Sequence, residues 1–577
     1  MNGDETTLIR DPFSVSPSPS LPPSPSQRAR SRSSSPRKLR RRLLRLRRKH
    51  TAVLTKYYSL GQSYSEPISS IVYSLAESLG REDNDILWNS IVGVSSLELY
   101  GRSTSGIGIS SSHPAGGSAG WAGLRGERIR QVLRDEVRRL NPPDPNDTRG
   151  ELLRGEASGV IPTTARSPDD HSIRLSPEPR FLLIRHWSLY DSMLHSPYLA
   201  SRLHTWSDVG RKRLHKLLAK MGVSLTQCKQ NYTHMDMDLK RGLRQRLLTY
   251  APMYGLEGLV PPAATHGQAR QGWGFVRSWG WKACLSATDV GVIIGAILEV
   301  GSNNVLGQKA YGPNAMTANT DRVLEDEEGK AETAAYVSRF FEAYDALSDP
   351  MTLKAALPTA QHLHRAILRS GATLLEKKQI RHLRAFRMGV VKDGPDVQLF
   401  THPGALTKLA LWVAEAINQK EAEGKATPLV LASLNEARGV YVVVGTGGGG
   451  SVIDWEKRKQ RKEKVEAAAR KREEKQEERA RRKRRRAEIL GEDEDEIESE
   501  EEDAEETEDD DDGDDNDDDD DEERAAGRNR FGNAFQEVVD ETNARVRIDS
   551  FEHCVVEVKK DDLSPFLEAL SDKAAVG

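Results

Sequence analysis

Residues 181–246 read FLLIRHWSLYDSMLHSPYLASRLHTWSDVGRKRLHKLLAKMGVSLTQCKQNYTHMDMDLKRGLRQR. Apolar side chains at the start of this stretch recur at steps of four, three and four, which predicts one buried face of a helix. These side chains are Leu183, Trp187, Tyr190 and Leu194. The break at His195-Ser196-Pro197 and the spacing from Tyr198 to Met221 predict a second helix. The stretch is therefore predicted to be a helical hairpin with Trp187, Tyr190 and Trp206 as structural anchors.

Basic residues form a strip along the second half of the same stretch. The strip comprises Arg211, Lys212, Arg213, Lys216, Lys220, Lys240, Arg241, Arg244 and Arg246. Clustered Lys and Arg attract phosphates and acidic surfaces, so the strip is predicted to contact nucleic acid or a partner protein. A solvated helix face that binds nothing is the alternative that the sequence leaves open.

The composition limits how much of the 577 residues can fold. Residues 1–50 and 456–527 are strongly biased and lack the apolar side chains that offset chain entropy, so both are predicted to be disordered. The net charge of −3 conceals a separation, because the N-terminus and residues 460–486 are basic whereas residues 492–523 are mostly Asp and Glu. Such blocks are typical of interaction tails.

Cysteine usage and hydropathy indicate the compartment. Cys228, Cys284 and Cys554 are far apart with no C-x-x-C spacing, so neither a disulfide framework nor a structural zinc site is expected, and a reducing compartment fits. No run of eighteen apolar residues and no secretory signal occur, which predicts a soluble, intracellular protein without a membrane partner.

The basic residues near the N-terminus match the pattern that nuclear import receptors recognise. They include Arg37, Lys38, Arg40, Arg41 and Arg42. Ser35 precedes them in a Ser-Pro-x-Lys pattern and is predicted to be a phosphosite whose charge would oppose theirs. The predicted localisation is the nucleus, and a nonspecific basic tail is the alternative.

The pattern of the remaining chain predicts an α/β fold with a large helical middle. Apolar spacing predicts helices over residues 68–79, 85–94, 125–140, 288–300, 332–347, 352–370 and 372–386. The period then changes, which predicts strands over residues 386–391, 397–400, 429–434, 439–445 and 553–558, with helices over residues 405–417, 531–543 and 563–570. The tract at residues 456–527 is thus predicted to interrupt one α/β domain. Trp273, Trp279 and Trp281 are predicted to pack in the core, with base stacking as the alternative.

Several segments resemble the eukaryotic cell division control protein 45 family, in the order that the family has them. They are DNDILWNSIVGV (83–94), HWSLYDS (186–192), SRLHTWSDVGRKRLHKLLAKMG (201–222) with Met235-Asp236, ATDVGVIIGAILE (287–299) and NRFGNAFQEVVDETNARVRIDSFEHCVVEV (529–558). Aromatic residues in long ordered matches make the resemblance specific. It extends from about residue 40 to the end of the chain, apart from the biased tracts.

The resemblance implies descent from the DHH phosphoesterases. It implies a disordered tail (1–50), a helical remnant of a DHH-like domain (51–110), a helical inter-domain region (111–370) and a DHH-associated-like α/β domain (371–577). By resemblance, the partners are the minichromosome maintenance ring, the GINS complex, replication-loading factors, single-stranded DNA and origin chromatin. The strands of the family's N-terminal DHH half do not precede residue 51, so either the sequence is truncated or the protein lacks that half. We expect a truncated sequence, because residues 64–100 would otherwise expose apolar stripes.

The residues that could support catalysis are weak candidates. Asp169-Asp170-His171 superficially resembles a D-H-H motif but lies in a Ser/Pro loop. By resemblance, Ser96 occupies the position of an aspartate in another family motif, and a hydroxyl is a poor substitute for a carboxylate as a metal ligand. Residues 445–450 fit G-x-G-x-x-G between a predicted strand and a predicted helix, but the helix runs into charged low complexity and no compact βαβ unit follows, which favours a hinge over a phosphate-binding loop. His186, His195, His204 and His215 do not share a helix turn and are predicted to be structural.

These observations predict a scaffold without catalytic residues, metal or cofactor. The function implied by the resemblance is DNA replication, in which the protein would join the ring and GINS within the replicative helicase and contact single-stranded DNA. A metal-dependent single-strand nuclease of the DHH type is the first alternative. An acidic chromatin-associated adaptor is the second.

Overall fold

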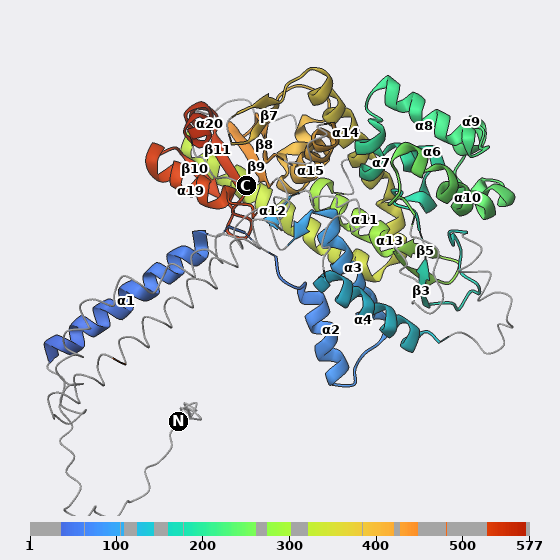
Figure 1. Cartoon of the computed structure of the whole chain (residues 1–577), viewed down its shortest axis with the longest axis horizontal. Coiled ribbons are helices and arrows are strands. Elements are labelled where there is room, and N and C mark those ends of the chain that lie inside the picture. The colour runs from blue at the N-terminus through green and yellow to red at the C-terminus, as the bar shows by residue number, and fades with distance from the viewer. Residues whose placement is uncertain are drawn as a thin grey trace, which may run out of the picture. The chain divides into compact units, whose positions relative to one another are not determined.

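The computed structural model describes residues 36–59, 61–62, 64–103, 106–108, 124–142, 160–176, 178–260, 274–301, 321–383, 385–420, 427–447, 481 and 528–572 (Figure 1). The chain separates into two units, residues 1–58 and residues 59–577. In the first unit, helix α1 (Pro36–Ser59) includes residues for which the composition predicted disorder. That prediction was wrong for residues 36–50, because Leu, Arg and Lys favour a helix even where no core covers it. Its Leu43, Leu46 and Val53 are exposed.

The helices of the second unit begin with α2 (Ile68–Ser78), α3 (Asn84–Leu99) and α4 (Leu124–Leu140). They continue through α6 (Leu189–Leu194), α7 (Pro197–Leu203), α8 (Asp208–Lys220), α9 (Leu225–Cys228), α10 (Met237–Tyr250) and α11 (Ala287–Val300). They end with α12 (Asp321–Ser348), α13 (Pro350–Ala355), α14 (Leu357–Glu376), α15 (Pro403–Lys420), α19 (Phe531–Thr542) and α20 (Leu563–Asp572). The helices predicted over residues 68–79, 85–94, 125–140, 288–300, 405–417, 531–543 and 563–570 are confirmed.

The largest sheet has the strand order β10-β11-β9-β8-β7-β6. Its strands are β6 (Arg381–His382), β7 (Arg387–Val391), β8 (Leu429–Asn435), β9 (Val440–Thr446), β10 (Val546–Ile548) and β11 (Val555–Lys559). β7 and β8 are parallel, with α15 as their crossover, and the other pairs are antiparallel. All residues of β9 are buried, and Phe531 of α19 lies where a side chain on Gly445 would be. The segments before and after residues 448–527 therefore pack together into one α/β domain.

A second sheet, with the strand order β3-β4-β5, was not predicted from the sequence. It contains β3 (Ile173–Ser176), β4 (Gly274–Trp279) and β5 (Ala283–Ser286), and a short hairpin of β1 (Arg102–Ser103) and β2 (Gly106–Ile107) lies elsewhere. Trp279 packs edge-on against Trp88 of α3 with ring centroids 5.7 Å apart. Trp281 is instead 75% exposed at the β4–β5 turn, and Trp273 lies outside the described residues.

Two other predicted elements were wrong. The helix predicted over residues 372–386 does not form, because α14 ends at Glu376 and Lys378 adopts a left-handed φ of 52°. The strand predicted over residues 397–400 is a 3-10 helix, Val397–Thr401. It follows a buried Asp396 that Arg369 of α14 binds through two hydrogen bonds of 2.7 and 2.8 Å. This tertiary contact fixes the turn.

Apolar side chains of the second unit form two separate cores. The main core draws on residues from α3 to α20, and thus on all three predicted folded domains. The other core lies between residues 161 and 260 and is built from α6 to α10. α2 leaves its apolar stripe uncovered by described residues, with Ile68, Ile71 and Leu75 exposed by 53–78%.

Candidate nucleic-acid and partner interface

Residues 178–260 form a helical unit with a core of its own. The predicted hairpin was wrong in detail, because its first helix begins only at Leu189 and its second is divided into α7 and α8. Leu183 and His204 have φ angles of 51° and 60°, which interrupt the expected helices. Serines at the N-caps restart them by accepting a hydrogen bond from the backbone three residues later. These serines are Ser188, Ser196, Ser207 and Ser224.

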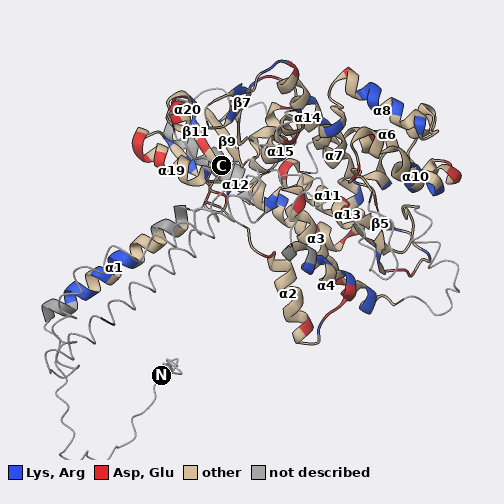
Figure 2. Cartoon of the chain, in the orientation of Figure 1, with Lys and Arg blue, Asp and Glu red and all other residues tan. Residues whose placement is uncertain are grey.

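α8 divides its side chains between the core and solvent. Leu214, Leu217 and Leu218 are fully buried in the helical unit. The opposite side exposes Arg211, Lys212, Arg213, Lys216 and Lys220, which we call the basic face of α8 (Figure 2). The rise of 1.5 Å per residue makes this face about 13 Å long.

Most cations of the basic face are not neutralised. Lys212, Arg213 and Lys216 make no ion pair with any described residue. Arg211 is 3.9 Å from Asp208, and both side chains are exposed, so water weakens this pair. Lys220 lies over the ring of Tyr254 at 5.5 Å. The positive charges of Lys212, Arg213 and Lys216 are therefore available to bind an anion.

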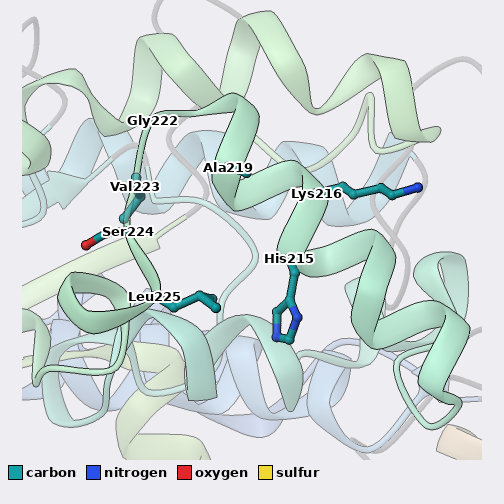
Figure 3. Close-up of a pocket in the computed structure, with 7 residues that line it drawn as sticks. All are labelled: His215, Lys216, Ala219, Gly222, Val223, Ser224 and Leu225. Carbon is teal, nitrogen blue, oxygen red and sulfur yellow. The ribbon is translucent and has the colours of Figure 1, made fainter.

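A groove of about 570 Å³ lies beside the basic face, between α8 and the segment that leads into α9 (Figure 3). Ala219, Val223 and Leu225 supply apolar surface, and Lys216 and Ser224 add polar groups. His215 and Leu225 lie on opposite sides, and Lys216 extends away from the groove. His215 Nε2 is 3.3 Å from the Tyr190 hydroxyl, which holds the imidazole in place. The sequence analysis did not predict this groove, because its two walls meet only in the folded chain.

α10 contributes less to the predicted strip than its sequence suggested. Lys240 is buried, its Nζ donates to the Thr233 carbonyl at 2.8 Å, and burial lowers its pKa. The structure therefore places Lys240 inside the helical unit, where it binds the Thr233 carbonyl, and not on the exposed basic strip that the sequence predicted. Arg241 is exposed 3.5 Å from Asp238, and Arg246 donates to the Met221 carbonyl at 3.0 Å. Arg244 is half-buried.

The predicted anchors lie where helices meet. Trp187 is buried and stacks on His195 with centroids 4.6 Å apart. Trp206 is buried and packs edge-on against Trp412 of α15 at 5.5 Å, which joins the helical unit to the main core. Tyr190 is half-buried. Burial lowers the pKa of His195, as it does for His186 and His204, so these imidazoles are held neutral.

The residues of the sequence motifs that resemble catalytic or nucleotide-binding motifs make structural contacts. Burial acts to raise the pKa of Asp170, but hydrogen bonds from Ser172 and from the backbone of Arg166 and Ser172 lower it overall. The Ser96 hydroxyl donates to the Gly93 carbonyl at 2.7 Å. Gly445 is a packing site for Phe531, and the glycines at 448–450 lie outside the described residues.

Within the described ranges, no group of three or more His, Cys, Asp or Glu is arranged to hold a metal ion. No helix in that part of the chain is long and apolar enough to cross a membrane. Arg40, Arg41 and Arg42 are exposed on α1, whereas Ser35 and the side chains of Arg37 and Lys38 lie outside the described structure.

Comparison with known proteins gives consistent matches. A family model described as CDC45 matches residues 18–573. The cell division control protein 45 homolog of Schizosaccharomyces pombe is 40% identical, over 91% of this chain and 67% of the relative. Cell division control protein 45 of Saccharomyces cerevisiae is 28% identical, over 90% of this chain and 64% of the relative. The chain thus spans about two thirds of the length of these relatives.

A solved structure agrees at the level of fold. The crystal structure of CDC45 from Entamoeba histolytica matches with a TM-score of 0.52 and 18% identity, covering 89% of this chain and 72% of that one. The α/β fold with a helical middle is therefore shared with this structure.

Proposed function

Because the chain belongs to the CDC45 family of DNA replication factors, we propose that it is a non-catalytic scaffold of the replicative helicase in the nucleus. In this role it joins the minichromosome maintenance ring to the GINS complex and contacts single-stranded DNA at origin chromatin. We also propose that its α/β parts descend from a DHH phosphoesterase. The observation that carries the proposed contact is the basic face of α8, whose Lys212, Arg213 and Lys216 have no described anionic partner.

The geometry of α8 suits a phosphate backbone. Its exposed cations follow one side of a helix whose other side is fixed in a core, so they are presented without a large loss of backbone entropy. A face about 13 Å long meets about two nucleotides of an extended strand, given a spacing of roughly 6 Å between successive phosphates. Contacts of this kind are independent of base sequence.

The nuclease alternative has less support. Two-metal hydrolysis requires several carboxylates and imidazoles that converge on a pair of ions. Asp170 is engaged by Ser172 and Arg174, and His171 beside it is exposed. A chelator-sensitive exonuclease activity of the purified chain would contradict the scaffold proposal.

Charge reversal on α8 tests the proposed contact. We expect the triple substitution Lys212→Glu, Arg213→Glu and Lys216→Glu to weaken binding of a fluorescent single-stranded oligonucleotide at least about tenfold at low salt, measured by anisotropy. The logarithmic salt slope should fall by about two, since each lost phosphate contact contributes about 0.7. Pull-down with the ring and GINS should be measured on the same proteins.

A matched control is available at the end of α14. Lys377, Lys378 and Arg381 are exposed cations, and their reversal to Glu changes the net charge equally. Equal weakening by both triples would show that net charge alone acts, and would overturn α8 as the contact. Deletion of residues 456–527 tests the acidic-adaptor alternative, which predicts that partner association is lost.

A further inference from the structure

We propose that the groove beside α8, together with its basic face, binds the acidic segment of the chain's own insertion, residues 487–523. The groove supplies an apolar floor and has Lys216 at its edge, and Lys212 and Arg213 lie within about one turn of Lys216 on the same helix. None of these three cations has a described ionic partner. A ligand for such a surface must carry negative charge and a few apolar side chains. This inference concerns the ligand of the groove and holds whether or not the same face also meets DNA.

The receptor surface is defined by three groups of side chains. Leu225, 42% exposed at the start of α9, and the exposed Ala219 form the accessible apolar part. Lys212, Arg213 and Lys216 form the cationic part, and Ser224 adds a hydroxyl. Asp208 is the acidic residue of α8, and it lies at the helix start beside Arg211. Lys229 extends the positive charge beyond the groove, over the ring of Tyr190 at 5.8 Å.

The insertion has the complementary composition. Its segment 487–499 reads AEILGEDEDEIES, in which Ile489, Leu490 and Ile497 stand among acids. Residues 492–523 contain 26 Asp and Glu out of 32. A purely acidic tract has no apolar side chains that could contact the apolar floor of the groove, but residues 487–499 do have them.

The basic run that precedes the acidic segment cannot neutralise it. Residues 456–523 contain 17 Lys and Arg against 34 Asp and Glu, which is a net charge of −17. The whole chain carries −3, so the remainder is positive by 14. The excess acid must be balanced by salt or by cations elsewhere on the chain, and the basic face of α8 presents such cations side by side.

The connection is long enough for the segment to reach α8. Thirty-nine residues, 448–486, lie between Gly447, which directly follows β9, and residue 487. Fully extended, they span about 130 Å, whereas a folded body of about 450 residues has a radius of gyration of roughly 22 Å. Tethering also gives the segment an effective concentration of the order of millimolar, so a weak site is sufficient.

Zero-length carbodiimide cross-linking of the full-length chain at low concentration tests the proposal. We expect amide links, identified by mass spectrometry, from Lys212, Lys216 and Lys220 to residues 487–523, and few from the equally exposed Lys377 and Lys378. The links should largely disappear in 0.5 M NaCl, where the Debye length falls to about 4 Å. Ile489→Ser, Leu490→Ser and Ile497→Ser together should also reduce them, although no charge changes.

A second measurement does not depend on the tether. A fluorescent peptide with the sequence of residues 487–505 should bind a variant in which Asp and Glu of 492–523 are replaced by Asn and Gln. We expect about tenfold weaker binding when Lys212, Arg213 and Lys216 are also reversed to Glu, but not when Lys377, Lys378 and Arg381 are. Links spread evenly over all exposed lysines, or peptide binding equally sensitive to both triples, would overturn the proposal.

Discussion

Replacing Lys408 by alanine is expected to lower the free energy of unfolding by about 3–5 kcal/mol, because it leaves a carboxylate buried without its counter-ion. Lys408 on α15 places its Nζ 2.7 Å from Oε1 of Glu299 on α11, with 8% and 1% of the two side chains exposed. The loss should be measured by urea unfolding followed through tryptophan fluorescence. An exposed lysine, Lys377, provides a control whose replacement by alanine should change stability little.

The surroundings of this pair enclose the two charges tightly in the native chain. The hydroxyl of Tyr100, at the C-cap of α3, donates to Glu299 Oε1 at 2.8 Å, and burial raises the pKa of Tyr100 well above its usual value. A side chain on Gly295 would come within 2.6 Å of Lys408 Nζ, so the three helices meet without spare space.

A paired substitution separates the charge from the packing. Lys408→Met with Glu299→Leu removes both charges and keeps most of the volume, so it should be clearly more stable than Lys408→Ala alone. A loss below about 1 kcal/mol for the single substitution would show that water reaches Glu299, against the burial described here.

The sequence predicted best those elements whose pattern is local. α3, α11 and α15 are long apolar helices, and β8 and β9 are adjacent runs joined by a tight turn at Gly439, so neighbouring residues carry the signal. The sheet β3-β4-β5 was missed because β3 and β4 pair across about a hundred residues. Its strands are four to six residues long, too short to show a clear period.

Helix ends were the other weakness, and for a physical reason. Leu183, His204 and Lys378 adopt left-handed backbone angles at positions where glycine would be the usual signal. Leu183 is buried in the main core, so packing accounts for its backbone angle, whereas Lys378 is exposed. The four serine N-caps of the helical unit are helix-start signals in the sequence, and they indicate the observed division of the predicted hairpin into shorter helices.

The candidate interface was predictable only in part. The basic face of α8 follows from the spacing of its leucines, since cations between buried positions must point outward. The same rule failed for Lys240, whose ammonium lies over the Tyr232 ring, 5.3 Å from its centroid, inside the helical unit. The groove required knowledge of how the chain returns after Gly222, which no local pattern contains.

Replacing Gly210 by alanine is expected to destabilise the helical unit by about 3 kcal/mol, because the new methyl group meets backbone that cannot move aside. An added Cβ would lie 1.9 Å from the His204 carbonyl oxygen and 2.5 Å from that of Leu203. Gly210 therefore lets the turn between α7 and α8 close tightly, and its N–H donates to the Ser207 cap at 3.1 Å.

Gly242 on α10 is the matched control for this substitution, because its added Cβ would meet only the flexible end of Arg246, at 3.1 Å. Gly242→Ala should be neutral or stabilising by up to about 1 kcal/mol, since alanine favours a helix over glycine. Urea unfolding should thus give opposite signs for the two changes. If Gly210→Ala unfolded like the native chain, the close turn that orients the basic face of α8 would be refuted.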